Sequence, residues 1–216
     1  ALSNYLTWAA DAYRLAEGTG SLVHSSLAFD FTLTALLAPL TVGGRVLILP
    51  PGTGPSGLAA ALRSHSDLSL LKLTPTHLDA LQRFTGGTEW AAGVRTLVLG
   101  GEQLHAEGLS ALRSLPDLRI FNEYGPTETV VGSTVHRVVT ATPDRGRVPI
   151  GRAVTGTVVT IRDRRGRPVP VGVPGEIRIG GAGLADGYLG DETATRERFV
   201  TDAHGPRPGE IHYRTG

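Results

Sequence analysis

The stretch LSLLKLTPTHLDAL, residues 68–81, shows how this chain is built. Its first six residues form a short apolar run, which predicts a buried strand. Thr74 and Pro75 then open a helix, because proline has no backbone donor to lose at the first helical position. Leu78 and Leu81 form one apolar face of that helix. The stretch therefore predicts a strand that leads directly into a helix.

The same alternation continues on both sides of this stretch. Further strands are predicted at Arg45–Leu49, which should be buried, at Arg95–Leu99 and at Leu118–Phe121, and further helices at Leu58–Ser64 and Leu104–Leu115. Strands and helices that alternate at this spacing indicate an α/β fold, a parallel sheet with crossover helices.

The pattern changes after about residue 140. β-branched runs at Val158–Ile161 and Glu176–Ile179 are separated by turn-forming residues, which predicts antiparallel strands with a hairpin around Gly166. We therefore expect an α/β subdomain at residues 1–140 and a small β-rich, barrel-like subdomain at residues 141–216.

The composition excludes several classes of function. The formal net charge is +1 with both signs dispersed, so we expect no binding to nucleic acid. No apolar run is long enough to span a bilayer and the start lacks a signal peptide, so we expect no membrane contact and a cytoplasmic location. The absence of cysteine excludes disulfides and thiol nucleophiles. Methionine is absent even at position 1, so we expect the chain to begin inside a longer protein.

Three of the predicted strands end in unusual residues, at 72–74, 100–102 and 122–129. Ligands of open parallel sheets bind beyond the carboxyl ends of the strands, so we expect these residues to share one crevice.

The segment at 122–129 suits a nucleotide. Tyr124 can stack on a purine, and Asn122 can read its amino edge. Thr127 can donate to a phosphate, and Glu128 can hold Mg²⁺, which prefers few carboxylates together with phosphate oxygens and water. A Gly-Pro turn with capping residues is the alternative.

The order of the motifs resembles a known family. NEYGPTE, residues 122–128, is similar to the signature of adenylate-forming enzymes in the form typical of nonribosomal peptide synthetases. Further matches in the family's order are Phe29-Asp30, GEIRIGG at 175–181, GLADGYL at 183–189 and YRTG at 213–216. Because the matches extend from about Leu27 to the last residue, the chain is identified as resembling the adenylation domains of these synthetases.

The resemblance implies an ATP-dependent ligase of secondary-metabolite biosynthesis. An amino-acid substrate and ATP would give an aminoacyl adenylate and pyrophosphate, with Mg²⁺, and the acyl group would then pass to a carrier-protein thiol. Implied partners are a peptidyl carrier protein, a condensation domain and an MbtH-like protein. The resemblance assigns the adenine site to Gly101, Glu102, Asn122 and Tyr124, the α-phosphate to Thr127, and the metal to Glu128; the last two are the implied catalytic residues.

Asp30 has two interpretations. It can cap the helix that follows it. By the resemblance, its carboxylate instead binds the α-ammonium of the substrate, a feature that separates amino-acid activators from acyl-CoA ligases. We expect the second role.

Lys72 is the only lysine of the chain, and leucines flank it on both sides. An edge-strand lysine that reaches water along its stem is one interpretation. A buried ammonium is the other, and because it would be costly without a partner, Glu123 at the end of another strand is the expected partner.

Nine residues match the family's pocket-lining positions. They are Asp30, Phe31, Thr34, Lys72, Val98, Gly100, Glu123, Val131 and Gly132. As an ordered set they resemble pockets that select asparagine. Lys72 can donate to the side-chain carbonyl and Glu123 can accept from the amide. Aspartate would place a second carboxylate beside Glu123, and glutamine would need depth that Phe31 denies. Hydroxyasparagine and aspartate stay open as alternatives.

The resemblance also predicts segments that this sequence lacks. A phosphate-binding loop would precede Ala1, and a ribose-binding aspartate and a C-terminal domain with a catalytic lysine would follow Gly216. That lysine neutralises charge at the reacting carboxylate. We therefore expect a fragment of an adenylate-forming N-terminal core that is inactive alone. An acyl- or aryl-acid ligase, which Asp30 disfavours, and a non-catalytic scaffold are the alternatives.

Overall fold

The computed structural model describes residues 1–139, 141–204 and 209–216, which form two compact units. The sheet unit comprises Leu6–Tyr124 and Thr134–Arg152, and the β-rich unit comprises Ala1–Tyr5, Gly125–Ser133 and Ala153–Gly216. The subdomain boundary predicted at residue 140 falls on a position outside the described residues.

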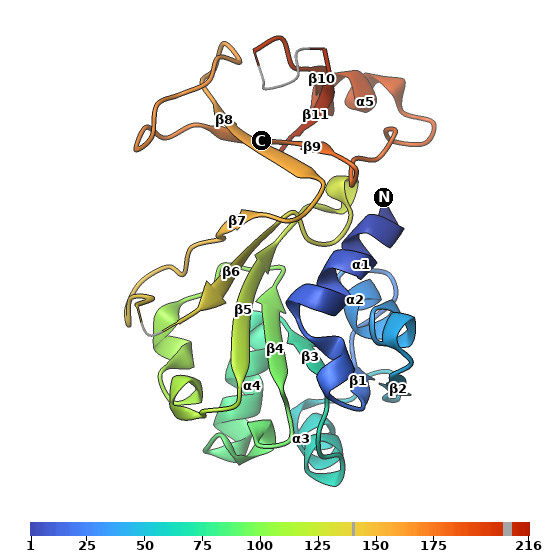
Figure 1. Cartoon of the computed structure of the whole chain (residues 1–216), viewed down its shortest axis with the longest axis vertical. Coiled ribbons are helices and arrows are strands. Elements are labelled where there is room, and N and C mark those ends of the chain that lie inside the picture. The colour runs from blue at the N-terminus through green and yellow to red at the C-terminus, as the bar shows by residue number, and fades with distance from the viewer. Residues whose placement is uncertain (140, 205–208) are drawn as a thin grey trace. The chain divides into compact units, whose positions relative to one another are not determined.

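Figure 1 labels the elements in chain order. The helices are α1 (Leu2–Ala12), α2 (Thr32–Leu37), α3 (Pro55–Ser64), α4 (Pro75–Thr85) and α5 (Glu192–Arg198). The strands are β1 (Gly20–Val23), β2 (Arg45–Ile48), β3 (Leu70–Leu73), β4 (Thr96–Gly100), β5 (Arg119–Tyr124), β6 (Thr134–Val138), β7 (Arg152–Ala153), β8 (Thr157–Arg162), β9 (Glu176–Gly181), β10 (Phe199–Thr201) and β11 (Ile211–Arg214).

The large sheet has the strand order β2-β1-β3-β4-β5-β6-β7. The five strands β2, β1, β3, β4 and β5 are parallel to one another, and β6 pairs antiparallel with β5. Helix α3 connects β2 to β3, and α4 connects β3 to β4. The predicted parallel sheet with crossover helices is therefore confirmed.

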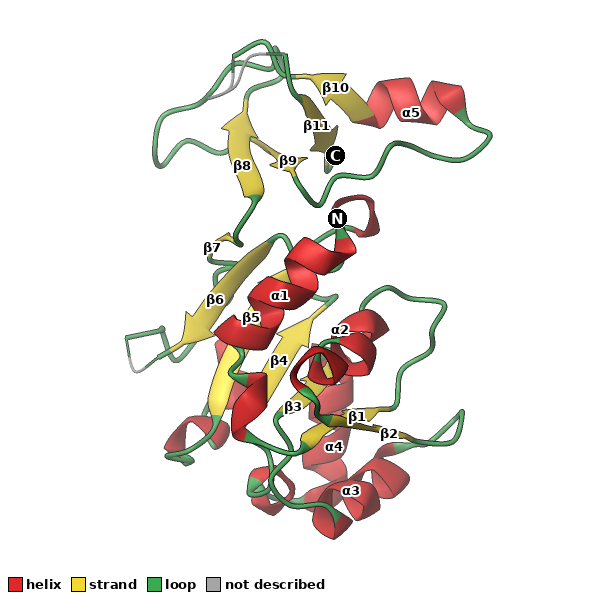
Figure 2. Ribbon diagram, turned by 45° about the vertical axis from the view of Figure 1, so that its right-hand side comes forward, coloured by secondary structure: helices red, strands yellow, loops and turns green. Residues whose placement is uncertain are grey.

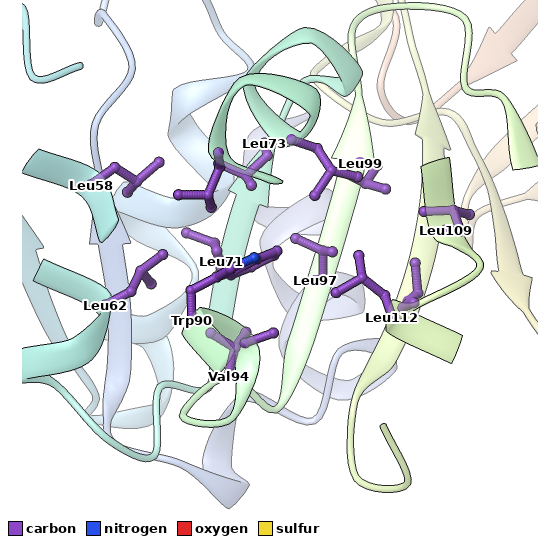
Figure 3. Packing of buried hydrophobic residues seen from close by; sticks show 14 of the residues in the cluster. Leu58, Leu62, Leu71, Leu73, Trp90, Val94, Leu97, Leu99, Leu109 and Leu112 are labelled. Carbon is purple, nitrogen blue, oxygen red and sulfur yellow. The ribbon is translucent and has the colours of Figure 1, made fainter. Parts of the chain in front are cut away.

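Alternation along the central strands gives the sheet two different faces. Leu71 and Leu73 of β3 and Leu97 and Leu99 of β4 point into the main core, which also contains residues of α3 and α4 (Figure 3). Helix α2 contacts β1 and β3, and Figure 2 shows α1 and α2 in front of the sheet with α4 behind it. The residues between the core leucines, Lys72 among them, therefore face away from this core.

Helix α4 begins as the sequence predicts. Thr74 is its N-cap, with its side chain accepting a hydrogen bond from the backbone N–H of His77, and Pro75 occupies the first turn. Leu78 and Leu81 are buried. Burial of a leucine side chain contributes roughly 1.5–3 kcal/mol, so these two residues anchor the helix to the core.

Two sequence-based expectations are wrong. Strand β2 is not buried, because it lies at the edge of the sheet, where Arg45 is exposed and Ile48 is 69% exposed. Residues 104–115 do not form one α-helix but two short 3₁₀ segments, Ala106–Leu109 and Leu112–Ser114. The backbone at their start bonds elsewhere: Ala106 N donates to Gly146 O and Val148 N donates to Leu104 O. These tertiary hydrogen bonds replace the helical ones.

The β-rich unit contains an antiparallel sheet in the order β10-β11-β9-β8. The predicted turn at Gly166 is present, since Gly166 N donates to Asp163 O and Arg162 forms a bridge with Pro168. Strand β8 nevertheless pairs along its whole length with β9 and not with the residues that directly follow the turn. Helix α5 begins at Glu192, and the carboxylate of its N-cap, Asp191, accepts a hydrogen bond from the backbone N–H of Ala194.

Among the described residues, no helix combines the length and the apolar character that crossing a membrane requires.

Candidate functional site

The predicted site residues divide between the two units. The sheet unit holds Asp30, Phe31, Thr34, Lys72, Val98, Gly100, Gly101, Glu102, Asn122, Glu123 and Tyr124. The β-rich unit holds Thr127, Glu128, Val131 and Gly132.

Neighbouring strands bring the pocket residues of the sheet unit together. In the strand register, Lys72 lies beside Val98, and Gly100 lies beside Glu123. Because side chains alternate along a strand, all four positions share the face opposite the main core. The predicted convergence at the ends of β3, β4 and β5 therefore exists for these residues.

A buried ion pair lies at the centre of this face. Lys72 Nζ is 2.5 Å from Glu123 Oε1, and the two side chains are only 1% and 2% exposed. Lys72 also donates to Thr34 Oγ1 at 2.6 Å. Glu123, the partner expected from the sequence, is thus the observed partner of the ammonium.

The environment of Lys72 combines burial with several compensating contacts. Burial lowers the pKa of the Lys72 ammonium, while the negative charges of Glu123 and Asp30 act in the opposite direction. The ammonium also lies 4.5 Å from the centre of the Phe31 ring, within the range of a cation–π contact. A charge is tolerated away from water only with such partners, so the charge of Lys72 depends on all of these neighbours together.

Sequence reasoning missed Tyr13, which completes this cluster. Its hydroxyl donates to Glu123 Oε2, and its side chain is fully buried. Tyr13 follows α1 and stands 110 residues before Glu123, so no local pattern connects the two.

Asp30 is not the N-cap of α2. That helix begins at Thr32, and its N-cap is Phe31, whose side chain makes no capping hydrogen bond. Asp30 is half-buried and close enough to influence the charge of Lys72. The capping interpretation of Asp30 is therefore wrong, and its carboxylate lies near the charged end of the pocket cluster.

Two glycines leave room at the end of β4. A Cβ atom on Gly100 would approach the backbone oxygen of Glu123 to 2.6 Å and the Phe31 ring to 3.6 Å. Gly101 has a φ of +79°, a left-handed conformation that other residues adopt at a cost. A larger residue at either position would thus displace the cluster or strain the turn.

Glu102 is engaged with the start of α4. Its Oε2 accepts hydrogen bonds from Thr76 N at 3.0 Å and from Thr76 Oγ1 at 2.6 Å. Burial opposes the charge of Glu102, but the hydrogen bonds from Thr76 and Thr74 outweigh it and lower its pKa. The carboxylate is therefore held in its ionised form beside Gly101.

Asn122 binds the loop at residues 148–149, a contact that was not expected from its predicted role in purine binding. Its Nδ2 donates to Pro149 O at 2.9 Å and to Val148 O at 3.3 Å. Asn122 itself is buried, whereas Tyr124, two residues later at the end of β5, is half-buried. Any contact of Asn122 with a ligand would thus involve its amide oxygen.

In the β-rich unit, Thr127 and Glu128 lie on a single 3₁₀ turn. The hydroxyl of Tyr188 donates to Glu128 Oε1 at 2.5 Å, and this hydrogen bond raises the pKa of Tyr188. The backbone oxygen of Glu128 accepts from Ala185 N at 2.9 Å. Tyr188 lies in one of the motifs that carry the resemblance. The sequence therefore indicated this residue but not its contact with Glu128.

The backbone before Gly132 is strained. Val130 and Val131 have φ values of 59° and 55°, a region that β-branched residues rarely adopt. Gly125 packs against this turn, because a Cβ there would lie 2.5 Å from Val131 O. Strain of this kind needs support from the surroundings, and it includes one of the predicted pocket positions, Val131.

The side chains near Glu128 could hold the implied Mg²⁺ only if the phosphates of a bound nucleotide supplied further ligands. No cluster of three or more His, Cys, Asp or Glu side chains that could hold a metal occurs in the described parts of the chain. Glu128 provides a single carboxylate, of which Oε1 is held by Tyr188. One carboxylate with phosphate oxygens and water is a set that Mg²⁺ accepts.

Comparisons with known proteins agree with these motifs. The profile of the AMP-binding enzyme family matches residues 1–189. Bacitracin synthase 3 of Bacillus licheniformis is 35% identical over 217 residues, which cover 100% of this chain and 3% of that protein. A dimodular nonribosomal peptide synthase of Bacillus subtilis (strain 168) is 38% identical over 217 residues, 100% of this chain and 9% of that protein. The chain thus spans a small part of the length of these relatives.

Solved structures extend the similarity to three dimensions. Holo-PA1221, a nonribosomal peptide synthetase protein with adenylation and PCP domains bound to a vinylsulfonamide inhibitor, matches with a TM-score of 0.84 and 31% identity over 94% of this chain and 35% of its own. Holo-AB3403, a four-domain nonribosomal peptide synthetase bound to AMP and glycine, matches with a TM-score of 0.85 and 32% identity over 100% of this chain and 16% of its own.

The AMPPNP-bound form of the synthetase FmoA3 (S1046A) gives a TM-score of 0.89 at 27% identity, over 100% of this chain and 23% of its own. The family match, the relatives and these structures all identify the same family. The chain belongs to the AMP-binding enzyme family, with similarity to nonribosomal peptide synthetases over its whole length.

Proposed function

We propose that this chain is part of an adenylation domain that activates asparagine. The substrate carboxylate would attack the α-phosphorus of ATP, forming an aminoacyl adenylate as pyrophosphate leaves. The thiol of a peptidyl carrier protein would then attack the acyl carbon and release AMP. Membership of the AMP-binding enzymes supports the first step, and the adenylation and PCP domains of PA1221 support the second.

The buried pair of Lys72 and Glu123 carries the proposal for the substrate. An ammonium has three N–H donors, and those of Lys72 point to Thr34 and Glu123 with one left for a ligand carbonyl. A carboxylate offers about four acceptor sites, so Glu123 can accept from an amide NH₂ in addition to its present partners. The side-chain amide of asparagine supplies one acceptor and one donor group, which matches this pair.

The same chemistry disfavours close analogues. Aspartate would bring a second carboxylate against Glu123 in a secluded site, a repulsive contact. Glutamine would need one more methylene of depth on the side where Phe31 packs against Lys72. Hydroxyasparagine keeps the amide and remains within the proposal.

The remaining roles follow the family resemblance and are proposed with it. Asp30 would bind the α-ammonium. The proposed adenine-site residues are Gly101, Glu102, Asn122 and Tyr124. Thr127 would donate to the α-phosphate and Glu128 would hold Mg²⁺, which supplies positive charge against the phosphates when bound.

The wider setting is also a proposal. We propose a cytoplasmic protein of secondary-metabolite biosynthesis with condensation and carrier domains in the same polypeptide and an MbtH-like partner. We further propose that residues 1–140 carry the amino-acid and adenine sites.

ATP–pyrophosphate exchange by the complete adenylation domain that contains this chain tests the proposal. We expect asparagine to give the highest kcat/KM among asparagine, aspartate, glutamine, leucine and phenylalanine. Because Glu128 would hold the metal of the nucleotide, Glu128→Ala should lower exchange by about 10²-fold or more at fixed Mg²⁺.

Each other outcome has a definite meaning. A preference for leucine or phenylalanine would overturn the assignment of the pocket, and a preference for aspartate would overturn only the role of Glu123. Exchange with fatty or aryl acids alone would identify an acyl- or aryl-acid ligase. Absence of ATP binding by the complete domain would identify a scaffold.

A further inference from the structure

Tyr13 combines a packing role with a polar contact. Its ring packs edge-on against Trp8, with centroids 5.3 Å apart, and against Phe121 at 5.0 Å. Its backbone oxygen accepts a hydrogen bond from Thr96 Oγ1 at 2.9 Å. A phenylalanine would satisfy all of these contacts, so they do not explain the hydroxyl.

The hydroxyl of Tyr13 is directed to Glu123, one of the proposed pocket residues. It is buried and donates to Glu123 Oε2, whereas Lys72 occupies Oε1 of the same carboxylate. A buried hydroxyl costs free energy unless it is paired, and its hydrogen bond to a carboxylate is of the stronger, charge-assisted kind. The two oxygens of Glu123 are therefore held from two different places in the fold, the residue that follows α1 and strand β3.

This arrangement limits the freedom of Glu123. The last torsion of a glutamate side chain is soft, so a carboxylate held at one oxygen can turn about it. A donor at each oxygen fixes the plane of the group. We infer that Tyr13 is a positioning residue for substrate selection, which orients Glu123 so that the carboxylate accepts from a side-chain amide; this inference rests on the proposed function.

The inference predicts a loss of discrimination rather than a loss of catalysis. Without the Tyr13 hydroxyl, Glu123 can turn toward Lys72 and leave the amide of the substrate without an acceptor. The contact of asparagine should weaken while the repulsion of aspartate is partly relieved. Removal of one hydrogen bond to a charged group has effects of roughly ten- to a hundredfold.

The test is Tyr13→Phe in the complete adenylation domain, with ATP–pyrophosphate exchange measured for asparagine and for aspartate. The ratio of kcat/KM for asparagine to that for aspartate should fall by roughly ten- to a hundredfold. The change should lie mainly in KM for asparagine, with KM for ATP unchanged. Tyr5→Phe is the control, because Tyr5 is a buried tyrosine of α1, the helix that Tyr13 follows, and its ratio should equal that of the wild type.

A double-mutant cycle shows whether Tyr13 acts through Glu123. In a Glu123→Gln background, Tyr13→Phe should produce no further change in the ratio. An unchanged ratio in the single variant, or equal rises in KM for asparagine and ATP with a lower Tm, would overturn the inference. The substrate preference of the wild-type domain is measured first. If that domain does not prefer asparagine, the proposed function itself fails, whatever the variants show.

Discussion

Each unit of this protein buries an ion pair, and the two pairs differ in what surrounds them. In the sheet unit, Lys72 lies 2.5 Å from Glu123, with side chains 1% and 2% exposed. In the β-rich unit, Arg162 lies 2.5 Å from Asp202, with both side chains 1% exposed. By distance and burial alone the pairs are equivalent.

The partners of Arg162 tie one part of the backbone to another. Its Nε donates to Thr160 Oγ1 at 3.1 Å and its Nη1 donates to His204 O at 3.3 Å. Asp202 in turn accepts from His204 N at 3.2 Å. The planar guanidinium thus joins β8 to the segment after β10, a use for which its fork of donors is suited.

The partners of Lys72 are Glu123 of β5, Thr34 of α2 and the ring of Phe31 just before α2, and all three occupy positions of the proposed pocket. A lysine ammonium is a point charge on a flexible stem, and its donors can be shared with a ligand. The comparison teaches that burial of a charge does not by itself indicate a functional site. The location of the partners decides: those of Arg162 tie β8 to the segment after β10, whereas those of Lys72 occupy positions of the proposed pocket.

The largest expected effect separates the two pairs directly. Lys72→Met and Arg162→Met each leave a buried carboxylate without its cation, so the free energy of unfolding should fall by about 3–5 kcal/mol in both cases. Only Lys72→Met should also reduce kcat/KM for asparagine, by roughly 10²-fold or more. Urea unfolding and ATP–pyrophosphate exchange by the complete adenylation domain measure both.

Replacing both partners provides the control. In Arg162→Met/Asp202→Leu, apolar contacts substitute for the pair, so stability should recover in part with exchange intact, while Thr160 and the backbone of His204 lose their partners. In Lys72→Met/Glu123→Leu, stability should recover only in part, because the hydroxyls of Tyr13 and Thr34 lose their charged partners. Loss of asparagine activation in the stable Arg162 double variant would break the comparison.

A smaller effect concerns pH and the β-rich unit. His212 is buried 3.5 Å from Asp202, and burial lowers its pKa, an effect that Asp202 and Glu210 oppose and that Arg162 and Arg178 reinforce. The unfolded chain therefore binds a proton that the folded chain refuses between the lowered pKa and the ordinary value of 6.5. Stability should fall as pH falls through this window, by at most about 1.4 kcal/mol per pH unit.

The variant His212→Gln should reduce this dependence when urea midpoints at about pH 7.5 and about pH 5.5 are compared. Some dependence should remain in the variant, because burial also lowers the pKa of His24 and His136 in the sheet unit. An unchanged pH slope in His212→Gln would show that this histidine does not titrate in the window.

The smallest effect is expected for an exposed pair. Arg83 and Asp79 lie 3.0 Å apart on α4, with side chains 79% and 60% exposed. Water screens such a pair, so Asp79→Ala should change the free energy of unfolding by less than about 1 kcal/mol and leave exchange unaltered. A larger loss would mean that distance matters more than burial, contrary to the comparison.

Much of the fold was predictable because its signals are local. The leucine-rich run before Thr74, the proline in the first turn of α4 and the alternation of elements all lie within short windows of sequence. Burial of Lys72 was predictable for the same reason, since leucines flank it. The helix expected at residues 104–115 failed because Ala106 and Leu104 bond to a segment about 40 residues away.

The sequence by itself determined the family, the parallel sheet and the residue types available at each strand end. Family motifs and the alternation of strands and helices can both be recognised within short segments of sequence. Only the tertiary structure decided which groups meet. It placed the Tyr13 hydroxyl on Glu123, assigned the edge position to β2 and paired Arg162 with Asp202 and the backbone of His204. Such contacts depend on strand order and on the packing of distant segments, and no local pattern specifies them.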